Sequence, residues 1–227
     1  MVLDLEHRIE IVKSRIADAA SRSDRSPEDI TLIAVSKTVN RAVVDEAYAL
    51  GLRQFGENRV QDTIIKYACP LPGDASLHMI GQLQSNKSAA AIQLFDVIQS
   101  VDRSSLIFAL EKHAATAGKI IDVLLEVNVA GEAQKAGCPL PQVDDLTGVI
   151  LKSPSLRLLG FMTMAPNTST AEEARPVFTE LRSIRDRLAE QFDVAFPWLS
   201  MGMTNDFEVA IEEGATHVRV GRAIFSE

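Results

Sequence analysis

The chain of 227 residues has few cysteines, no excess of basic residues and no long apolar run, and each of these absences excludes a class of protein. Two cysteines, Cys69 and Cys138, are too few for a disulfide framework and lack metal-ligand spacing, which favours a reducing, cytoplasmic location. Lysine and arginine number 23 against 31 aspartate and glutamate, a net charge of −8. Because nucleic-acid binders need a dominant basic face, a general phosphate-backbone binder is excluded.

No stretch reaches the roughly 20 apolar residues that a membrane-spanning helix needs, so we expect no membrane association. The start of the chain also lacks the uninterrupted apolar core of a signal peptide. It mixes charged residues with Leu5, Ile9, Val12 and Ile16 at helical spacing. This pattern predicts an amphipathic helix over about residues 3–22.

The rest of the chain alternates regularly between strand-like and helix-like segments. Eight apolar runs predict strands that begin near Ile30, Leu52, Ser76, Asp96, Ile121, Leu156, Pro197 and Thr216. Helical periodicity lies between them, over residues 42–50, 59–67, 87–94, 104–117, 142–151, 170–191 and 207–213. This alternation predicts a parallel sheet, and eight units favour an α/β fold with a single (β/α)8 barrel over residues 1–227 rather than an open doubly wound sheet.

Polar residues gather where the predicted strands end: Lys37, Glu57, Asn58, Gln82, Asp102, Arg103, Asn128, Thr163, Ser200, Arg219 and Arg222. In a (β/α)8 barrel the carboxyl ends of all strands meet at one mouth, where such proteins place their sites. We therefore expect the site at this mouth. We expect the N-terminal helix to cap the opposite floor of the barrel rather than to bind a partner.

Lys37 ends the first predicted strand, within "ITLIAVSK". It has the same strand parity as Ile33 and Val35, so its amine points into the mouth if those two side chains line the barrel interior. The alternative is a lysine that ends a strand and simply reaches water. The position alone does not decide between the two.

The last sixth of the chain, "LSMGMTNDFEVAIEEGATHVRVGRAIF", contains the parts of a phosphate site. Barrels of this type often hold a phosphate between the loops after strands seven and eight. Thr204 or Asn205 would cap a helix that begins near Thr204, Gly221 would allow close backbone approach, and Arg222 follows it. An ordinary helix cap and a turn glycine explain the same residues equally well.

Arg219 lies within a strand-like apolar run, and its guanidinium keeps its proton, so it needs a partner if it points into the barrel. Glu126 or Asp122 on the fifth strand would form a structural ion pair with it, and a ligand atom with a lone pair is the other possible partner. A permanent positive charge also favours the neutral amine of a neighbouring lysine. A neutral Lys37, a phosphate site and an arginine in one mouth suggest an aldehyde phosphate held as an imine.

Six motifs together carry a family resemblance: "AVSKT", "FGENRVQ", "HMIGQLQSNK", "EVNVAGEAQKAGC", "LGFMTMAP" and the C-terminal segment quoted above. From about Ile30 to its end the chain resembles the YggS/PROSC family of pyridoxal 5′-phosphate homeostasis proteins. The resemblance implies a barrel similar to the N-terminal domain of alanine racemases, known as fold-type III. It also implies pyridoxal 5′-phosphate as the cofactor.

The matching motifs place the family's cofactor pocket on eight residues of this chain: Lys37, Asn58, Ser200, Met203, Thr204, Arg219, Gly221 and Arg222. Lys37 resembles the Schiff-base lysine and Arg219 the partner of the pyridine nitrogen. Thr204 and Gly221, with the backbone that follows Gly221, resemble phosphate ligands. Asn58, Ser200 and Met203 resemble side chains that line the pocket, and Arg222 resembles a position that contributes its backbone.

The resemblance implies storage, buffering or delivery of the cofactor, without established turnover. An arginine at the pyridine nitrogen keeps it unprotonated and so disfavours the carbanion that transamination or decarboxylation needs. In alanine racemases the second base is a tyrosine from an added domain, whereas Tyr48 and Tyr67 fall on predicted outer helices. We expect a monomeric carrier that passes pyridoxal phosphate to apoenzymes.

Two alternative functions remain open. A fold-type III amino-acid racemase would use Lys37 and a second base such as His78, Cys138 or a water. A class I aldolase would use Lys37 to form an imine with a sugar phosphate and would need no cofactor.

Overall fold

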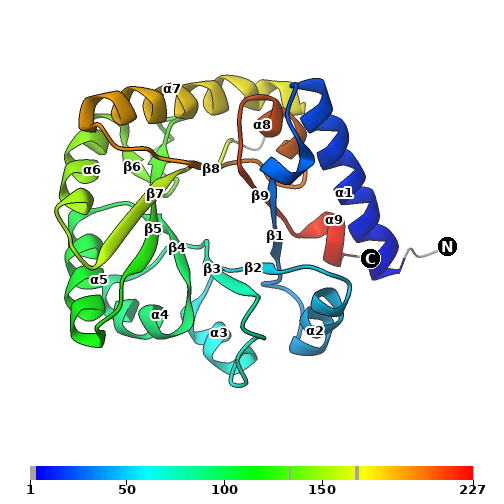
Figure 1. The fold of residues 1–227 in the computed structure, drawn as a ribbon, viewed down its shortest axis with the longest axis horizontal. Coiled ribbons are helices and arrows are strands. Elements are labelled where there is room, and N and C mark those ends of the chain that lie inside the picture. Colours follow the sequence, from blue (N-terminus) through cyan, green and yellow to red (C-terminus); the bar gives the residue numbers. More distant parts are fainter. Residues whose placement is uncertain (1–3, 133, 167–168, 227) are drawn as a thin grey trace.

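Eight parallel strands form a closed barrel in the computed structural model, which describes residues 4–132, 134–166 and 169–226. The strands follow one another around the ring in the order β4-β3-β2-β1-β9-β8-β7-β5, and a β4–β5 pairing closes it (Figure 1). Their bounds are β1 Thr31–Val35, β2 Gln54–Glu57, β3 Ser76–Met79, β4 Val97–Val101, β5 Ile121–Asn128, β7 Leu156–Met162, β8 Trp198–Ser200 and β9 His217–Val220. The predicted α/β barrel and its eight strands are confirmed.

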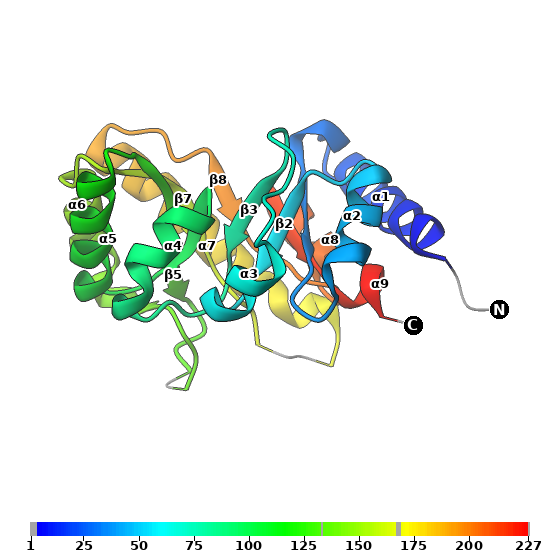
Figure 2. The ribbon, with the colours of Figure 1, turned by 90° about the horizontal axis from the view of Figure 1, so that it is seen from below.

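One short strand was not predicted. The two residues of β6 (Cys138–Pro139) pair in parallel with Val127 and Asn128 of β5, beside the closed ring. Two residues carry no periodic pattern, so the sequence gives no signal for such a strand. In Figure 2 the segments that follow β5 and β7 extend from the same end of the barrel.

Helices surround the ring and cover its outer face (Figure 1). Their bounds are α1 Leu5–Arg22, α2 Arg41–Ala49, α3 Val60–Lys66, α4 Ser88–Leu94, α5 Ser104–Ala117, α6 Val143–Leu151, α7 Arg175–Phe192, α8 Phe207–Glu212 and α9 Arg222–Phe225. Four short 3₁₀ turns add η1 Pro27–Asp29, η2 Ser85–Lys87, η3 Leu140–Gln142 and η4 Ala171–Ala174. Within the described ranges, no helix combines the length and apolar character needed to cross a membrane.

The N-terminal helix lies on the wall of the barrel, so the prediction that it caps the floor is wrong. Helix α1 packs against α8 and α9, outside the ring (Figure 1). Its predicted start at residue 3 lies outside the described residues, and Asp4 caps it by accepting a hydrogen bond from the backbone of His7. The short helices α8 and α9 cover little of the barrel wall by themselves, and the buried stripe of α1 completes that cover.

Candidate functional site

The loops that carry Lys37 and Gly221 lie side by side at the carboxyl end of the barrel. Lys37 follows β1 in an exposed turn, and its amine has no hydrogen bond or ion pair within the part of the chain that the structure describes. Strand β9 pairs with β1 so that Val220 lies opposite Ala34. A Cβ atom added to Gly221 would lie 3.1 Å from the carbonyl oxygen of Val35, so the backbones approach as closely as a glycine allows. Arg222, which is exposed, begins α9 directly after this contact.

The turn after β8 carries Met203 and Thr204. Helix α8 begins at Phe207 with Asp206 as its N-cap, so the predicted cap at Thr204 or Asn205 is wrong. The carboxylate of Asp206 accepts a hydrogen bond from the backbone N–H of Met203 at 2.6 Å and closes a turn before the helix starts. This leaves Met203 exposed and Thr204 half-buried at the rim.

The acidic residues at the start of α8, Asp206 and Glu208, do not repel an anion bound at this turn. Glu208 faces α1, where its two oxygens pair with Arg15 at 2.7 Å and Arg22 at 3.0 Å. Asp206 is bound within its own turn, and burial raises its pKa. A neutral or internally bound carboxyl group repels a phosphate far less than a free carboxylate does.

Gly202 sets the close packing of this turn, which gives a prediction. Its φ is +91°, and an added Cβ would lie 2.6 Å from Ala210 Cβ and 2.8 Å from Phe207 Cα. Gly51 has a φ of +93° with nothing within 4 Å of its added Cβ, so Gly51→Ala is a matched control for backbone strain. We expect Gly202→Ala to lose about 2 kcal/mol more unfolding free energy than Gly51→Ala, measured in urea, because only the first must displace α8. Equal losses would show that the turn can expand without cost.

Arg219 points into the barrel and is 4% exposed. It donates from Nη1 to Ser200 Oγ at 2.7 Å and from Nη2 to the carbonyl oxygen of Thr163 at 2.8 Å. Of the two partners that the sequence left open, a structural ion pair with Asp122 or Glu126 does not form among the described residues. Asp122 instead pairs with Arg157 at 2.5 Å near the opposite end of β5. Neutral acceptors on β8 and after β7 hold the guanidinium.

The positive charge of Arg219 affects the pKa of Glu126 without a direct ion pair among the described residues. Glu126 is 2% exposed, and its Oε1 atom is buried without a hydrogen-bond partner. Burial, helped by the neighbouring Asp102 and opposed by Arg219, raises the pKa of Glu126 to about 7. Glu126 therefore changes charge near neutral pH inside the barrel.

A chain of hydrogen bonds crosses the barrel interior from Arg219. Ser200 accepts from Arg219 and donates to Gln99 Oε1 at 2.6 Å. The amide nitrogen of Gln99 then faces His78 Nδ1 at 2.9 Å, and His78 Nε2 faces Gln54 Oε1 at 2.7 Å. Since an amide nitrogen only donates, His78 accepts at Nδ1 and donates from Nε2, which is its neutral form. Burial lowers the pKa of His78 to about 4, in agreement with a neutral imidazole.

Asn58 and Glu57, both predicted at the mouth, lie on opposite faces at the end of β2. Asn58 is half-buried at the rim, where a Cβ added to Gly81 would lie 2.3 Å from the Asn58 carbonyl oxygen. Glu57 lies on the opposite face of the strand and points toward α3. Tyr67, predicted to lie on an outer helix, is the C-cap of α3 and is buried with its hydroxyl 3.1 Å from Glu57 Oε1.

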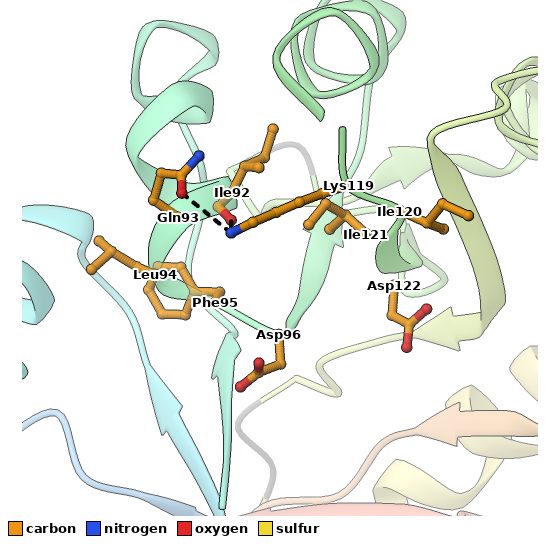
Figure 3. A pocket seen from close by; sticks show the side chains of 9 residues that line it. All are labelled: Ile92, Gln93, Leu94, Phe95, Asp96, Lys119, Ile120, Ile121 and Asp122. Carbon is orange, nitrogen blue, oxygen red and sulfur yellow. Dashed lines mark hydrogen bonds between the residues drawn. The ribbon is translucent and has the colours of Figure 1, made fainter. Parts of the chain in front are cut away.

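Two surface hollows, of about 360 and 390 Å³, both lie at the amino ends of strands, away from the mouth. Figure 3 shows the first, which Phe95, Asp96 and Asp122 line with their neighbours before β4 and at the start of β5. Its polar groups are already bound: Lys119 donates to the Ile92 carbonyl oxygen and to Gln93, both at 3.2 Å, and Asp96 accepts from the backbone of Leu77. We therefore assign the candidate site to the mouth.

Comparison with known proteins identifies the class and then the family. The model of the alanine racemase N-terminal domain matches residues 10–227, so this is a barrel of that class. The chain belongs to the family of pyridoxal phosphate homeostasis proteins: it is 42% identical to the member from Aquifex aeolicus, over 97% of this chain and 96% of that one. It is 38% identical to the member from Pseudomonas aeruginosa, over 94% and 91% of the two chains.

A solved structure supports the same assignment. PipY from Synechococcus elongatus PCC7942, determined with pyridoxal phosphate bound, has a TM-score of 0.82 and 37% sequence identity, covering 93% of this chain and 100% of that chain. The likeness also begins earlier than the predicted start near Ile30, since the family model includes most of α1. The helix on the barrel wall is thus part of the family fold.

Proposed function

We propose that this chain binds pyridoxal 5′-phosphate through Lys37 and stores, buffers or delivers it. The observation that carries the proposal is the Lys37 amine, which has no partner among the described residues, at the same rim as the close contact between Gly221 and Val35. When bound, pyridoxal phosphate supplies an aldehyde that a neutral lysine amine joins as a Schiff base with release of water. The family's named role in cofactor homeostasis supports the same proposal.

The groups at the mouth fit the cofactor's anionic and ring ends. On this proposal the Thr204 hydroxyl and the backbone from Gly221 to Arg222 hold the phosphate, and Arg222 adds positive charge. Arg219 has five N–H donors, and among the described residues two of them are used, by Ser200 and Thr163. Donors therefore remain for the pyridine nitrogen. Three further side chains line the pocket: Asn58, Ser200 and Met203.

The structure also supports a carrier over a racemase. Both ring nitrogens of His78 are bound to glutamine side chains, and its lowered pKa makes it a poor proton acceptor. Burial raises the pKa of Cys138 to about 12, so its thiol stays protonated at neutral pH. Neither side chain suits the second base that racemisation requires.

The exposed Lys37 favours exchange of the cofactor with other proteins. On this proposal the acceptors are apoenzymes that use pyridoxal phosphate, and the chain works as a cytoplasmic monomer. Delivery and scavenging both need a link that forms and reverses, which a Schiff base at an exposed turn provides.

Borohydride reduction tests the proposal. After incubation with pyridoxal phosphate and reduction, peptide mass analysis should find the pyridoxyl-phosphate adduct on Lys37. An unmodified Lys37 peptide would reject the proposal, and an adduct formed with a sugar phosphate instead would favour an aldolase. Chiral analysis of alanine and serine incubated with the loaded protein should show no inversion above that of free cofactor; rapid inversion would favour a racemase.

A further inference from the structure

A polar cluster lies between the barrel and α3, directly behind the strand end that carries Lys37. It consists of Ser36, Glu57, Lys66 and Tyr67, and we call it the Glu57 cluster. The Oε1 atom of Glu57 accepts three hydrogen bonds, from Ser36 Oγ at 2.7 Å, Lys66 Nζ at 2.9 Å and the Tyr67 hydroxyl at 3.1 Å. Lys66 Nζ also donates to the carbonyl oxygen of Ser36 at 2.8 Å.

Strand parity explains why these residues meet outside the barrel. Ser36 directly follows β1, and strand alternation turns its side chain toward the helices, where it donates to Glu57. Lys37 is the next residue and lies in the turn. Glu57 alternates in the same way with Gln54, whose side chain bonds His78 in the barrel interior. Lys66 is the last residue of α3. The helix C-terminus thus places a lysine amine behind the peptide that joins Ser36 to Lys37.

Every polar atom of Ser36 is bound. Its N–H donates to the carbonyl oxygen of Gly56 at 3.0 Å, and its hydroxyl donates to Glu57. Its carbonyl oxygen accepts from Lys66 at 2.8 Å and from the backbone N–H of Val39 at 3.1 Å. That carbonyl belongs to the peptide plane that continues into Lys37, so the plane is fixed although the Lys37 side chain is exposed.

Stability alone does not explain the buried Lys66–Glu57 ion pair, because removing both charges from water costs free energy. The two side chains are 11% and 1% exposed, so both charges are largely removed from water. Replacing such a pair with apolar side chains is often neutral or stabilising, so its Coulomb energy does not by itself account for it. What an apolar pair could not do is donate to the Ser36 carbonyl.

We propose that Lys66, held in place by Glu57, is a positioning residue for Lys37. By fixing the peptide that precedes Lys37, it restricts the positions from which the Lys37 side chain can reach the aldehyde. It does not touch the cofactor. The inference rests on the proposed function, because it assigns a partner to the same lysine.

The test compares Lys66→Met with Lys119→Met, since Lys119 also donates to a backbone carbonyl but lies at the other end of the barrel (Figure 3). Two probes separate covalent positioning from binding: pyridoxal phosphate, followed by Schiff-base absorbance, and pyridoxine phosphate, an alcohol that cannot form the link. We expect Lys66→Met to slow Schiff-base formation about tenfold, with pyridoxine phosphate affinity changed less than about twofold. Lys119→Met should match the wild type with both probes.

Two further variants keep the result decisive. Lys66→Arg retains donors for Glu57 and Ser36 and should recover most of the rate. The double variant Lys66→Met, Glu57→Gln leaves no unpaired carboxylate, so it should fold normally. Its Schiff-base formation should remain as slow as that of Lys66→Met. Wild-type rates in Lys66→Met or in the Lys66→Met, Glu57→Gln double variant would overturn the inference, as would equal losses for both probes. If the wild type itself forms no link, the proposed function fails and not this inference alone.

Discussion

Lys37→Ala should abolish the Schiff-base absorbance that the wild-type protein gains with pyridoxal phosphate. The lysine at the end of α3, Lys66, cannot replace it, because its amine is bound to Glu57 and to the carbonyl oxygen of Ser36. Reduction with borohydride followed by intact mass measurement should show the adduct in the wild type and its loss in the variant. The expected effect is complete loss, since no covalent link can form without the amine.

The phosphate end of the site provides the control for this variant. Lys37 is exposed and bears no structural hydrogen bond among the described residues, so its truncation should leave folding unchanged. Pyridoxine phosphate should therefore bind Lys37→Ala within about threefold of its wild-type affinity, through the loops at Thr204 and Gly221. A persistent adduct of wild-type stoichiometry in Lys37→Ala would place the link on another lysine.

The barrel could be predicted from the sequence because parallel strands buried on both faces appear as short apolar runs. Each of the eight runs became a strand, and Lys37 could be placed at a strand end by counting from Thr31. The position of α1 could not be predicted, because an amphipathic pattern shows that a helix has a buried face but not what covers it. Helix α8 begins later than predicted because Asp206, a better N-cap type than Thr204, takes the cap position.

The polar interior was harder to predict than the rim. Gln99 lies within "DVIQSVD", where nothing in the pattern showed that it joins Ser200 to His78. Glu57 was grouped with the mouth residues by its place at a strand end. Its alternation with Gln54 and Asn58 carried the signal that it faces α3, and strand parity could have found it.

Arg219→Met should give the largest loss of stability among the predicted substitutions, about 3 kcal/mol at pH 8 in urea unfolding. Arg219 is buried, and its removal leaves the Thr163 carbonyl oxygen without its donor and breaks the chain through Ser200. It also removes the positive charge that stabilises ionised Glu126. Methionine keeps much of the side-chain volume, so the loss reports charge and hydrogen bonding more than a cavity.

The pH dependence of this loss follows from the groups around Glu126, which are Asp102, Cys138 and Arg219. The pKa of Glu126 is about 7 in the folded protein against an ordinary 4.5, so the folded state holds the proton more tightly. Rising pH across this window therefore lowers stability, by up to about 3 kcal/mol. Without Arg219 the pKa of Glu126 rises further, so Arg219→Met should cost more at pH 8 than at pH 5.

A double variant assigns that difference to Glu126. Arg219 also contributes to the lowered pKa of His217, which burial holds near 3, so its removal eases protonation of His217 in acid and acts in the same direction. Adding Glu126→Gln to Arg219→Met removes the carboxyl group but not the histidine. We expect the double variant to be more stable than Arg219→Met at pH 8 and to lose most of the difference between pH 5 and pH 8. If that difference is unchanged, the groups that Arg219 controls are His217 and Asp206, whose pKa values it also lowers, and not Glu126.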